Sequence, residues 1–235
     1  MTAKEIVKQL EALGTEPYRR VLRNHQVEEP LFGVKVEELK KIQKKVKKDH
    51  ALALDLYDTQ IYDAQYLAGL IADETQMTRK DLEKWLAKAN GEAIRGTTVA
   101  WVAAESAHGR ELALAWIDSK NEETARAGWA TLGSLVAVTD DADLDAAELT
   151  RLLKRVEKGI HQQPNGVRSA MNGFVIALGT YVKGLTPLAV QAGKKIGPVT
   201  VDVGNTACKV PYSPDSIEKA RKRGAIGKKR ATARC

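Results

Sequence analysis

Apolar residues recur at three- and four-residue spacing along almost the whole chain before residue 196. This spacing places them on one face of an amphipathic helix. Clear examples are AKEIVKQLEAL (3–13), RKDLEKWLAKA (79–89) and AAELTRLLKRVEKGI (146–160). Turn signals such as Asn90-Gly91 and His108-Gly109 separate the helices at short intervals. The pattern predicts an all-α domain of stacked helical hairpins.

The pattern changes near residue 198, where PVTVDV (198–203) alternates like a strand. The stretch VTVDVGNTACKVPYSP (199–214) is rich in β-prone residues and contains a Gly-Asn turn, which predicts a short hairpin or an extended strap. SPDSIEKARKR (213–223) then predicts a short helix. We therefore expect a helical domain over 1–198 and an irregular or β-like extension over 199–235.

Four helical segments can be aligned with one another. They are YDAQYLAGLIA (62–72), EAIRGTTVAWVA (92–103), ETARAGWATLGS (123–134) and NGVRSAMNGFVI (165–176). Each begins polar and becomes apolar, and the segments between them would be partner helices. A helix pair of roughly 30–45 residues is typical of HEAT or armadillo-type repeats. The sequence therefore predicts an α-α superhelix of HEAT-like repeats.

The same early position in each aligned segment holds Gln65, Arg95, Arg126 and Arg168. An arginine in the first turn is unfavourable to the helix dipole. Stacked repeats would line these arginines along the concave surface, where guanidinium groups beside free backbone N–H groups suit phosphate oxygens. In the alternative interpretation, each arginine pairs with a nearby acid, such as Glu92 or Glu122, and only stabilises its own repeat.

The net charge of +7 comes from the C-terminal end. Residues 219–235 contain eight basic and no acidic side chains, whereas the rest of the chain has 29 basic and 30 acidic ones. A run of like charges is usually flexible and often an interaction arm. We expect either a solubilising tail or a flexible tail that contacts DNA. The candidates are Arg221, Lys222, Arg223, Lys228, Lys229 and Arg230.

A second basic cluster lies in FGVKVEELKKIQKKVKKDH (32–50). Helical spacing places Lys40, Lys44, Lys47 and Lys48 on one face. Such a run is usually a solvated face, but it could also be a platform for a phosphate backbone.

The tryptophans predict mostly core packing, with one candidate for a contact to DNA. Trp129 lies three residues after Arg126, so it could share the exposed face of the arginine and stack on a nucleobase.

Several classes of site and location are disfavoured. The four histidines lack ligand spacing, and neither a Gly-rich phosphate loop nor a Ser/His/Asp order occurs, so we expect no metal and no cofactor. Two cysteines, Cys208 and Cys235, do not make a disulfide framework.

No apolar run approaches the ~18 residues of a membrane span, and the charged N-terminus lacks a signal peptide. We expect a cytoplasmic monomer without membrane contact, associated with the nucleoid when bound to DNA.

Two motifs resemble a known family. LFGVKVEELKKI (31–42) is similar to the entry motif of the DNA alkylation repair family of HEAT-like repeats, the AlkD-like 3-methyladenine DNA glycosylases. ETARAGWATL (123–132) resembles the repeat of that family that carries an arginine in contact with DNA. The resemblance covers about residues 20–195. It implies that Arg126 contacts DNA held on a concave basic face.

The resemblance also implies a catalytic set that this chain reproduces only in part. The AlkD-like enzymes excise cationic alkylated purines with an aspartate between tryptophans, because a carboxylate stabilises the oxocarbenium character of the sugar. The aspartate should fall near GEAIR (91–95), where Arg95 takes its approximate place, and the later tryptophan falls near Gly173-Phe174. The remaining candidate acids are Glu92 and Glu105, and Glu105 forms an aromatic–carboxylate pair with Trp101.

Family members that lack this set bind DNA, including branched or damaged forms, without excising bases. We therefore expect a protein that binds DNA nonspecifically through its phosphate backbone. The alternatives are an active glycosylase with a relocated carboxylate and a protein-interaction solenoid.

Overall fold

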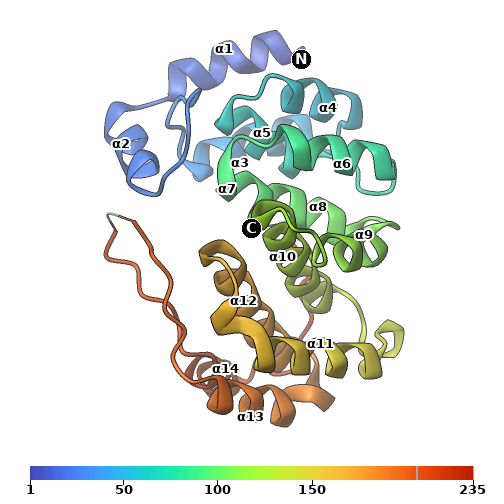
Figure 1. The fold of residues 1–235 in the computed structure, drawn as a ribbon. Coiled ribbons are helices and arrows are strands. Elements are labelled where there is room, and N and C mark those ends of the chain that lie inside the picture. The colour runs from blue at the N-terminus through green and yellow to red at the C-terminus, as the bar shows by residue number, and fades with distance from the viewer. Residues whose placement is uncertain (205, 235) are drawn as a thin grey trace. The chain divides into compact units, whose positions relative to one another are not determined.

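The computed structural model describes residues 1–204 and 206–234, so Asn205 of the expected turn and Cys235 lie outside the described residues (Figure 1). The described chain is helical and contains no β-strand, which confirms the all-α prediction. It divides into two compact units. Unit 1 comprises Met1–His108, Val203–Ala207 and Arg234; unit 2 comprises Gly109–Asp202 and Cys208–Ala233. Among the described residues, no single helix is long and apolar enough to cross a membrane; one pair of helices bent by 112° meets that test only by length and composition.

Unit 1 contains the first eight α-helices. They are α1 (Ala3–Leu13), α2 (Glu16–Asn24), α3 (Val36–Val46), α4 (His50–Asp58), α5 (Tyr62–Ile71), α6 (Arg79–Lys88), α7 (Gly91–Ile94) and α8 (Ala100–Glu105). A π-helical segment, Arg95–Val99, joins α7 to α8 without a break in helical dihedrals. In the core, the rings of Tyr57 and Trp85 stack with centroids 4.0 Å apart.

Unit 2 contains the remaining helices. They are α9 (Gly109–Trp116), α10 (Glu122–Val138), α11 (Ala146–Gly159), α12 (Asn165–Tyr181), α13 (Thr186–Ile196) and α14 (Ser213–Lys222). Helices α10 and α12 run parallel, because the first turn of α12 lies beside Arg126 and its middle lies beside Gly133. Trp129 and Phe174 meet in the core between them, with ring centroids 5.4 Å apart.

The predicted repeats appear as consecutive helix pairs: α4 with α5, α6 with the α7–α8 segment, α9 with α10, and α11 with α12. Side-chain caps explain where several of these helices begin. Asn121 accepts a hydrogen bond from Thr124 N (2.9 Å) at the start of α10, and Asp145 accepts one from Glu148 N (2.9 Å) at the start of α11. Each cap satisfies a first-turn N–H that has no partner inside the helix.

The LFGV stretch before α3 is held by an internal contact. The buried Asp63 carboxylate accepts hydrogen bonds from Phe32 N (2.6 Å) and Val34 N (2.8 Å). Gly33 between them has φ +76°, and a Cβ there would lie 2.6 Å from Arg19 N. Burial raises the pKa of Asp63, although the hydrogen bonds from these backbone amides oppose the rise. This motif is therefore structural.

Residues 199–204 and 206–212 are irregular rather than β-like. The alternating residues 199–202 do not form a strand, because they pack against and hydrogen-bond with other parts of unit 2. Val199 is buried in the core, and Asp202 exchanges two hydrogen bonds with the side chain of Asn165 (2.8 and 2.9 Å).

The basic tail, predicted to be flexible, contains α14 and several specific contacts. Gly227 N donates to Thr180 O (2.8 Å) and Arg230 N to Ala137 O (2.8 Å), so the tail caps the C-terminal ends of α12 and α10. Arg234 is only 7% exposed and lies in unit 1. These contacts hold the tail against residues that are far away in the sequence, which the local charge pattern of the tail does not indicate.

Candidate nucleic-acid interface

Arg126 is the fifth residue of α10, at the start of its second turn, and is half-buried, whereas the first turn contains Glu122 and Glu123. These acids offset the arginine at the positive end of the helix dipole. Oε1 of Glu122 also accepts a hydrogen bond from Gly166 N (2.9 Å) and so caps α12. A Cβ on Gly166 would lie 3.0 Å from Arg126 Cδ, so the arginine stem packs over the first turn of α12.

Arg168 is the fourth residue of α12 and is also half-buried. Its Nε is buried and has no hydrogen-bond partner among the described residues. Since α10 and α12 are parallel, Arg126 and Arg168 belong to the same end of this helix pair. The predicted register of arginines in early helical turns is thus present within unit 2.

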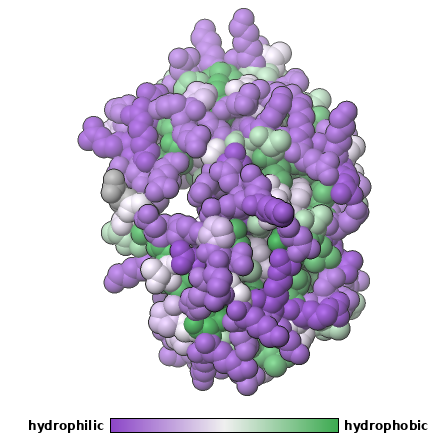
Figure 2. Space-filling view, viewed as in Figure 1, coloured by the Kyte–Doolittle hydropathy of each residue, from purple (hydrophilic) through white to green (hydrophobic). Residues whose placement is uncertain are grey.

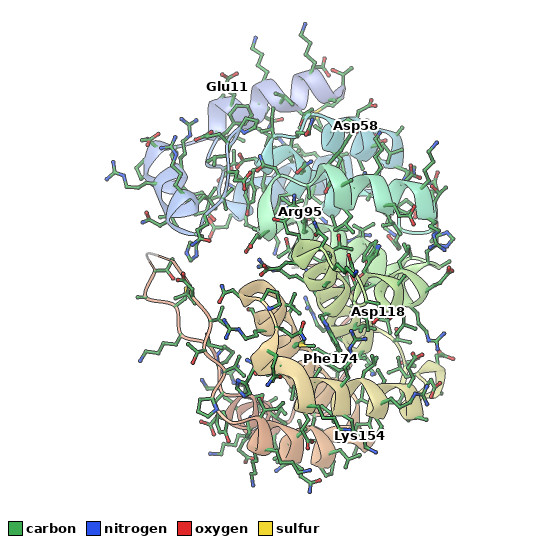
Figure 3. All side chains as sticks on the ribbon, viewed as in Figure 1. Glu11, Asp58, Arg95, Asp118, Lys154 and Phe174 are labelled. Atoms are coloured by element: carbon green, nitrogen blue, oxygen red, sulfur yellow. The ribbon has the colours of Figure 1, made fainter. Side chains whose placement is uncertain are left out.

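Arg95 lies in unit 1, at the first position of the π-helical segment, and is half-buried (Figure 3). A π-helical turn widens the helix locally and often occurs at functional sites. Thr98 in this segment packs against Gly69 of α5, where a Cβ would lie 2.5 Å from Thr98 Cγ2. This close approach fixes the segment that carries Arg95.

Gln65 occupies the corresponding position in the first repeat, but its side chain is wholly buried. Its Nε2 donates to Tyr57 O (3.1 Å) and Lys88 O (2.8 Å), and its Oε1 accepts from Asn90 N (2.7 Å). Gln65 therefore ties α5 to the ends of two neighbouring helices.

The lysines around α3 do not all share one helical face, and that prediction is wrong. The helix ends at Val46, and Lys47 has φ +62°, which turns the chain away from the helical path. Lys48 pairs with Glu74 at 2.5 Å. Lys40 is half-buried and Lys44 is exposed, so these two remain candidates on the helix.

The tail residues differ in what they offer to a ligand. Lys229 is unsuitable, because its Nζ contacts Val136 O (2.9 Å) and Asp141 Oδ1 (2.8 Å) at the end of α10. Arg221 is exposed and pairs with Glu218 (2.9 Å). The exposed residues Lys222, Arg223, Lys228 and Arg230 remain candidates.

Trp129 does not share an exposed face with Arg126, and this expectation is wrong. Its side chain is 0% exposed, because Phe174 covers it from α12 and the Arg155 guanidinium lies over its ring at 5.7 Å. Trp129 therefore offers no free ring face for base stacking.

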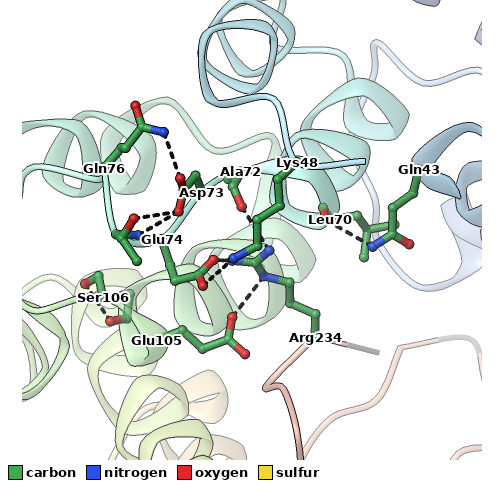
Figure 4. A network of polar contacts seen from close by, with 12 residues as sticks. Gln43, Lys48, Leu70, Ala72, Asp73, Glu74, Gln76, Glu105, Ser106 and Arg234 are labelled. Carbon is green, nitrogen blue, oxygen red and sulfur yellow. Dashed lines mark hydrogen bonds and ion pairs between the residues drawn. The ribbon is translucent and has the colours of Figure 1, made fainter. Parts of the chain in front are cut away.

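Of the two candidate acids, Glu105 is held by an ion pair. Arg234 places Nε 3.1 Å from Glu105 Oε2, and its other nitrogens bind Ala72 O (2.9 Å) and Glu74 Oε2 (2.7 Å) (Figure 4). Burial disfavours the charged form of Glu74, but hydrogen bonds from Lys48 and Arg234 outweigh it and lower the pKa of this carboxyl. Glu92 is exposed on α7. A role for Glu105 as a catalytic acid would require it to leave Arg234.

A groove between α10 and α12 was not predicted. It has a volume of about 260 Å³ and lies wholly within unit 2. Its lining consists of Trp129, Ala130, Gly133, Ser134 and Ala137 of α10, Ala170, Gly173, Phe174, Ala177 and Tyr181 of α12, and Arg230. Small residues at helical spacing on both segments were a visible signal, but the parallel packing of the two helices was not. Figure 3 labels Phe174 on α12, and Figure 2 shows that hydrophilic side chains cover most of the face in view.

The fold and these arginines define a class of protein, the all-α helical-repeat proteins whose helices carry arginine near their N-terminal ends. The chain belongs to the DNA alkylation repair enzyme family, whose family model matches residues 6–199. This confirms the resemblance drawn from the LFGV and ETARAG motifs.

Similar proteins agree with this assignment. Uncharacterised proteins of Listeria monocytogenes and Listeria innocua are each 31% identical to the chain, and the matches cover 95% of it and 99% of each relative. A solved structure is described as "a new family of proteins related to the HEAT-like repeat DNA glycosylases with affinity for branched DNA structures". It is 33% identical with a TM-score of 0.91, and the match covers 100% of both chains. The fold is therefore that of HEAT-like repeats.

Proposed function

We propose that this protein binds DNA through phosphate contacts of Arg126 and Arg168 and prefers branched over continuous duplex DNA. The observation that carries the proposal is the placement of both arginines at the same end of the parallel helices α10 and α12. A half-buried arginine whose stem is packed can bind an anion with little further loss of side-chain entropy.

The buried, unpartnered Nε of Arg168 supports an anionic ligand. That nitrogen is itself out of reach of a ligand, but a phosphate bound to the terminal guanidinium nitrogens would stabilise the same charge. A phosphate near α10 would likewise relieve the conflict between Arg126 and its helix dipole. The preference for branched DNA rests on the description of the structure that is 33% identical.

Other basic residues extend the proposal within each unit. In unit 1 these are Arg95, Lys40 and Lys44, and in unit 2 they are the exposed tail residues Lys222, Arg223, Lys228 and Arg230. Phosphate contacts of this kind position a protein on DNA without reading its sequence. We therefore propose nonspecific binding.

The test is the salt dependence of binding to a fluorescent three-way junction and to a linear duplex, measured by anisotropy. Replacing Arg126 or Arg168 with alanine should weaken binding and reduce the slope of log K against log salt by about one each. Arg151→Ala is a matched control, because Arg151 is an exposed arginine on the partner helix α11.

Two outcomes would contradict the proposal. An unchanged slope in both arginine variants would exclude their phosphate contacts. Absence of any salt-dependent affinity for DNA would instead favour a protein-interaction solenoid.

A further inference from the structure

Helix α12 begins without a side-chain cap of its own. Pro164, at the N-cap position, has no side-chain oxygen to accept a hydrogen bond, and the Asn165 side chain is bound to Asp202 (2.8 and 2.9 Å). The first-turn N–H groups of a helix need partners from outside it. Here Oε1 of the half-buried Glu122 accepts the hydrogen bond from Gly166 N (2.9 Å), so the cap of α12 comes from the first residue of α10.

Glu122 and Arg126 contact the same turn of α12. They are four residues apart on α10 and therefore share a face of that helix. A Cβ on the buried Gly166 would lie 3.3 Å from Glu122 Oε1, 3.0 Å from Arg126 Cδ and 3.4 Å from Arg126 Nη1. The Glu122 carboxylate is thus close to the stem of Arg126 and is bonded to the start of the helix that carries Arg168.

We propose that Glu122 is a positioning residue for DNA, whose hydrogen bond favours binding while its charge opposes it; the inference rests on the proposed function. The hydrogen bond joins the N-terminal ends of α10 and α12 and so holds Arg126 and Arg168 at the same end of the helix pair. The negative charge, in contrast, repels a phosphate that approaches Arg126. Alignment needs only the oxygen, because a neutral amide oxygen accepts the same hydrogen bond.

The test measures binding of a fluorescent three-way junction by anisotropy at two salt concentrations, together with the melting temperature of each variant. Glu122→Gln keeps the acceptor and removes the charge. It should lower the melting temperature only slightly and bind the junction about threefold more tightly than wild type at low salt. The gain should shrink at high salt, because salt screens the repulsion that the substitution removes.

Glu122→Ala removes both the acceptor and the charge. Compared with Glu122→Gln, it should bind the junction about tenfold more weakly, and the slope of log K against log salt should fall by about one, because one arginine loses its alignment. The comparison of these two variants isolates the hydrogen bond, since neither carries the charge.

Asp145→Ala is the matched control. Asp145 caps α11 by accepting a hydrogen bond from Glu148 N (2.9 Å), so its replacement also removes one cap and one negative charge from unit 2. The loss of stability should be similar to that in Glu122→Ala, whereas the affinity for the junction should stay at the wild-type level. An equal loss of affinity in both variants would show that the effect follows from stability alone, and would overturn the inference.

Two further results would overturn the inference and leave DNA binding in place. One is Glu122→Gln that binds no more tightly than wild type at low salt, and the other is Glu122→Ala that binds as tightly as Glu122→Gln. The second result is expected if Glu122 only stabilises its own repeat. If wild type does not bind the junction, or if Arg126→Ala and Arg168→Ala both bind it like wild type, the proposed function itself is wrong.

Discussion

At the residue scale, polar contacts within the repeats explain several side chains that resemble functional ones in the sequence. Asp63 holds the LFGV loop, and Gln65 joins three helices. Both are buried, and both satisfy backbone groups that would otherwise lack partners. Their role is to position the repeats, whereas Arg126 and Arg168 are only half-buried.

Asp73 supplies a pH-dependent contribution to stability. Hydrogen bonds from the Gln76 and Thr75 side chains and from Thr75 N lower the pKa of this carboxyl from 3.8 to about 2. The unfolded chain therefore binds a proton at higher pH than the folded protein, so the contribution is complete above about pH 4 and lost as the pH falls through 2.

We expect Asp73→Asn to flatten the acid limb of a plot of melting temperature against pH between about 4 and 2. Titration of the Asp73 carboxyl by NMR checks the midpoint directly. A midpoint near 3.8 would contradict the hydrogen-bonding explanation.

At the element scale, α10 and α12 use glycine for two different purposes. Gly128 lets α10 lie against Ala113 and Ile117 at the end of α9, where a Cβ would come within 2.9 Å of Ala113 O. Gly173 faces open space on α12. The same substitution should therefore have opposite effects at the two positions.

Gly173→Ala should raise the free energy of unfolding by about 0.5–1 kcal/mol, because alanine is the better helix former. Gly128→Ala should lower it by roughly 1–3 kcal/mol, because the added methyl forces α9 and α10 apart. Denaturant unfolding measures both values. A stabilising Gly128→Ala would show that the contact with α9 yields at little cost.

At the scale of the whole molecule, Arg234 makes contacts that no local pattern indicates. Its hydrogen bond to Ala72 O spans 162 residues of sequence, and the guanidinium lies between two carboxylates that are themselves mostly buried. Removing the arginine leaves a backbone carbonyl and two acids short of their donor.

Arg234→Ala should therefore lower the free energy of unfolding by about 2–3 kcal/mol, below the usual value for a fully buried pair because the acids keep some solvent contact. Arg221→Ala, which removes an exposed ion pair from the same basic tail, should change it by no more than about 0.5 kcal/mol. Equal effects in the two variants, measured by urea unfolding, would contradict a buried role for Arg234.

The same distinction between local and distant contacts decides what the sequence could predict. Helices and repeats follow from apolar periodicity and from caps such as Asn121, and the arginine positions follow from the repeat alignment. The burial of Trp129 depends on side chains from α11 and α12, and the Glu105–Arg234 pair depends on residues far apart in the chain. Neither arrangement leaves a trace in local spacing.

The open position at Gly173 bears on how this surface changes during evolution. Nearly any other residue there would improve the helix, so selection for folding alone favours replacing the glycine. A protein that retains the glycine has a less stable helix, and no packing contact within the fold compensates for this loss, as expected where activity and stability oppose each other. Engineering this protein for heat resistance would therefore begin with Gly173→Ala.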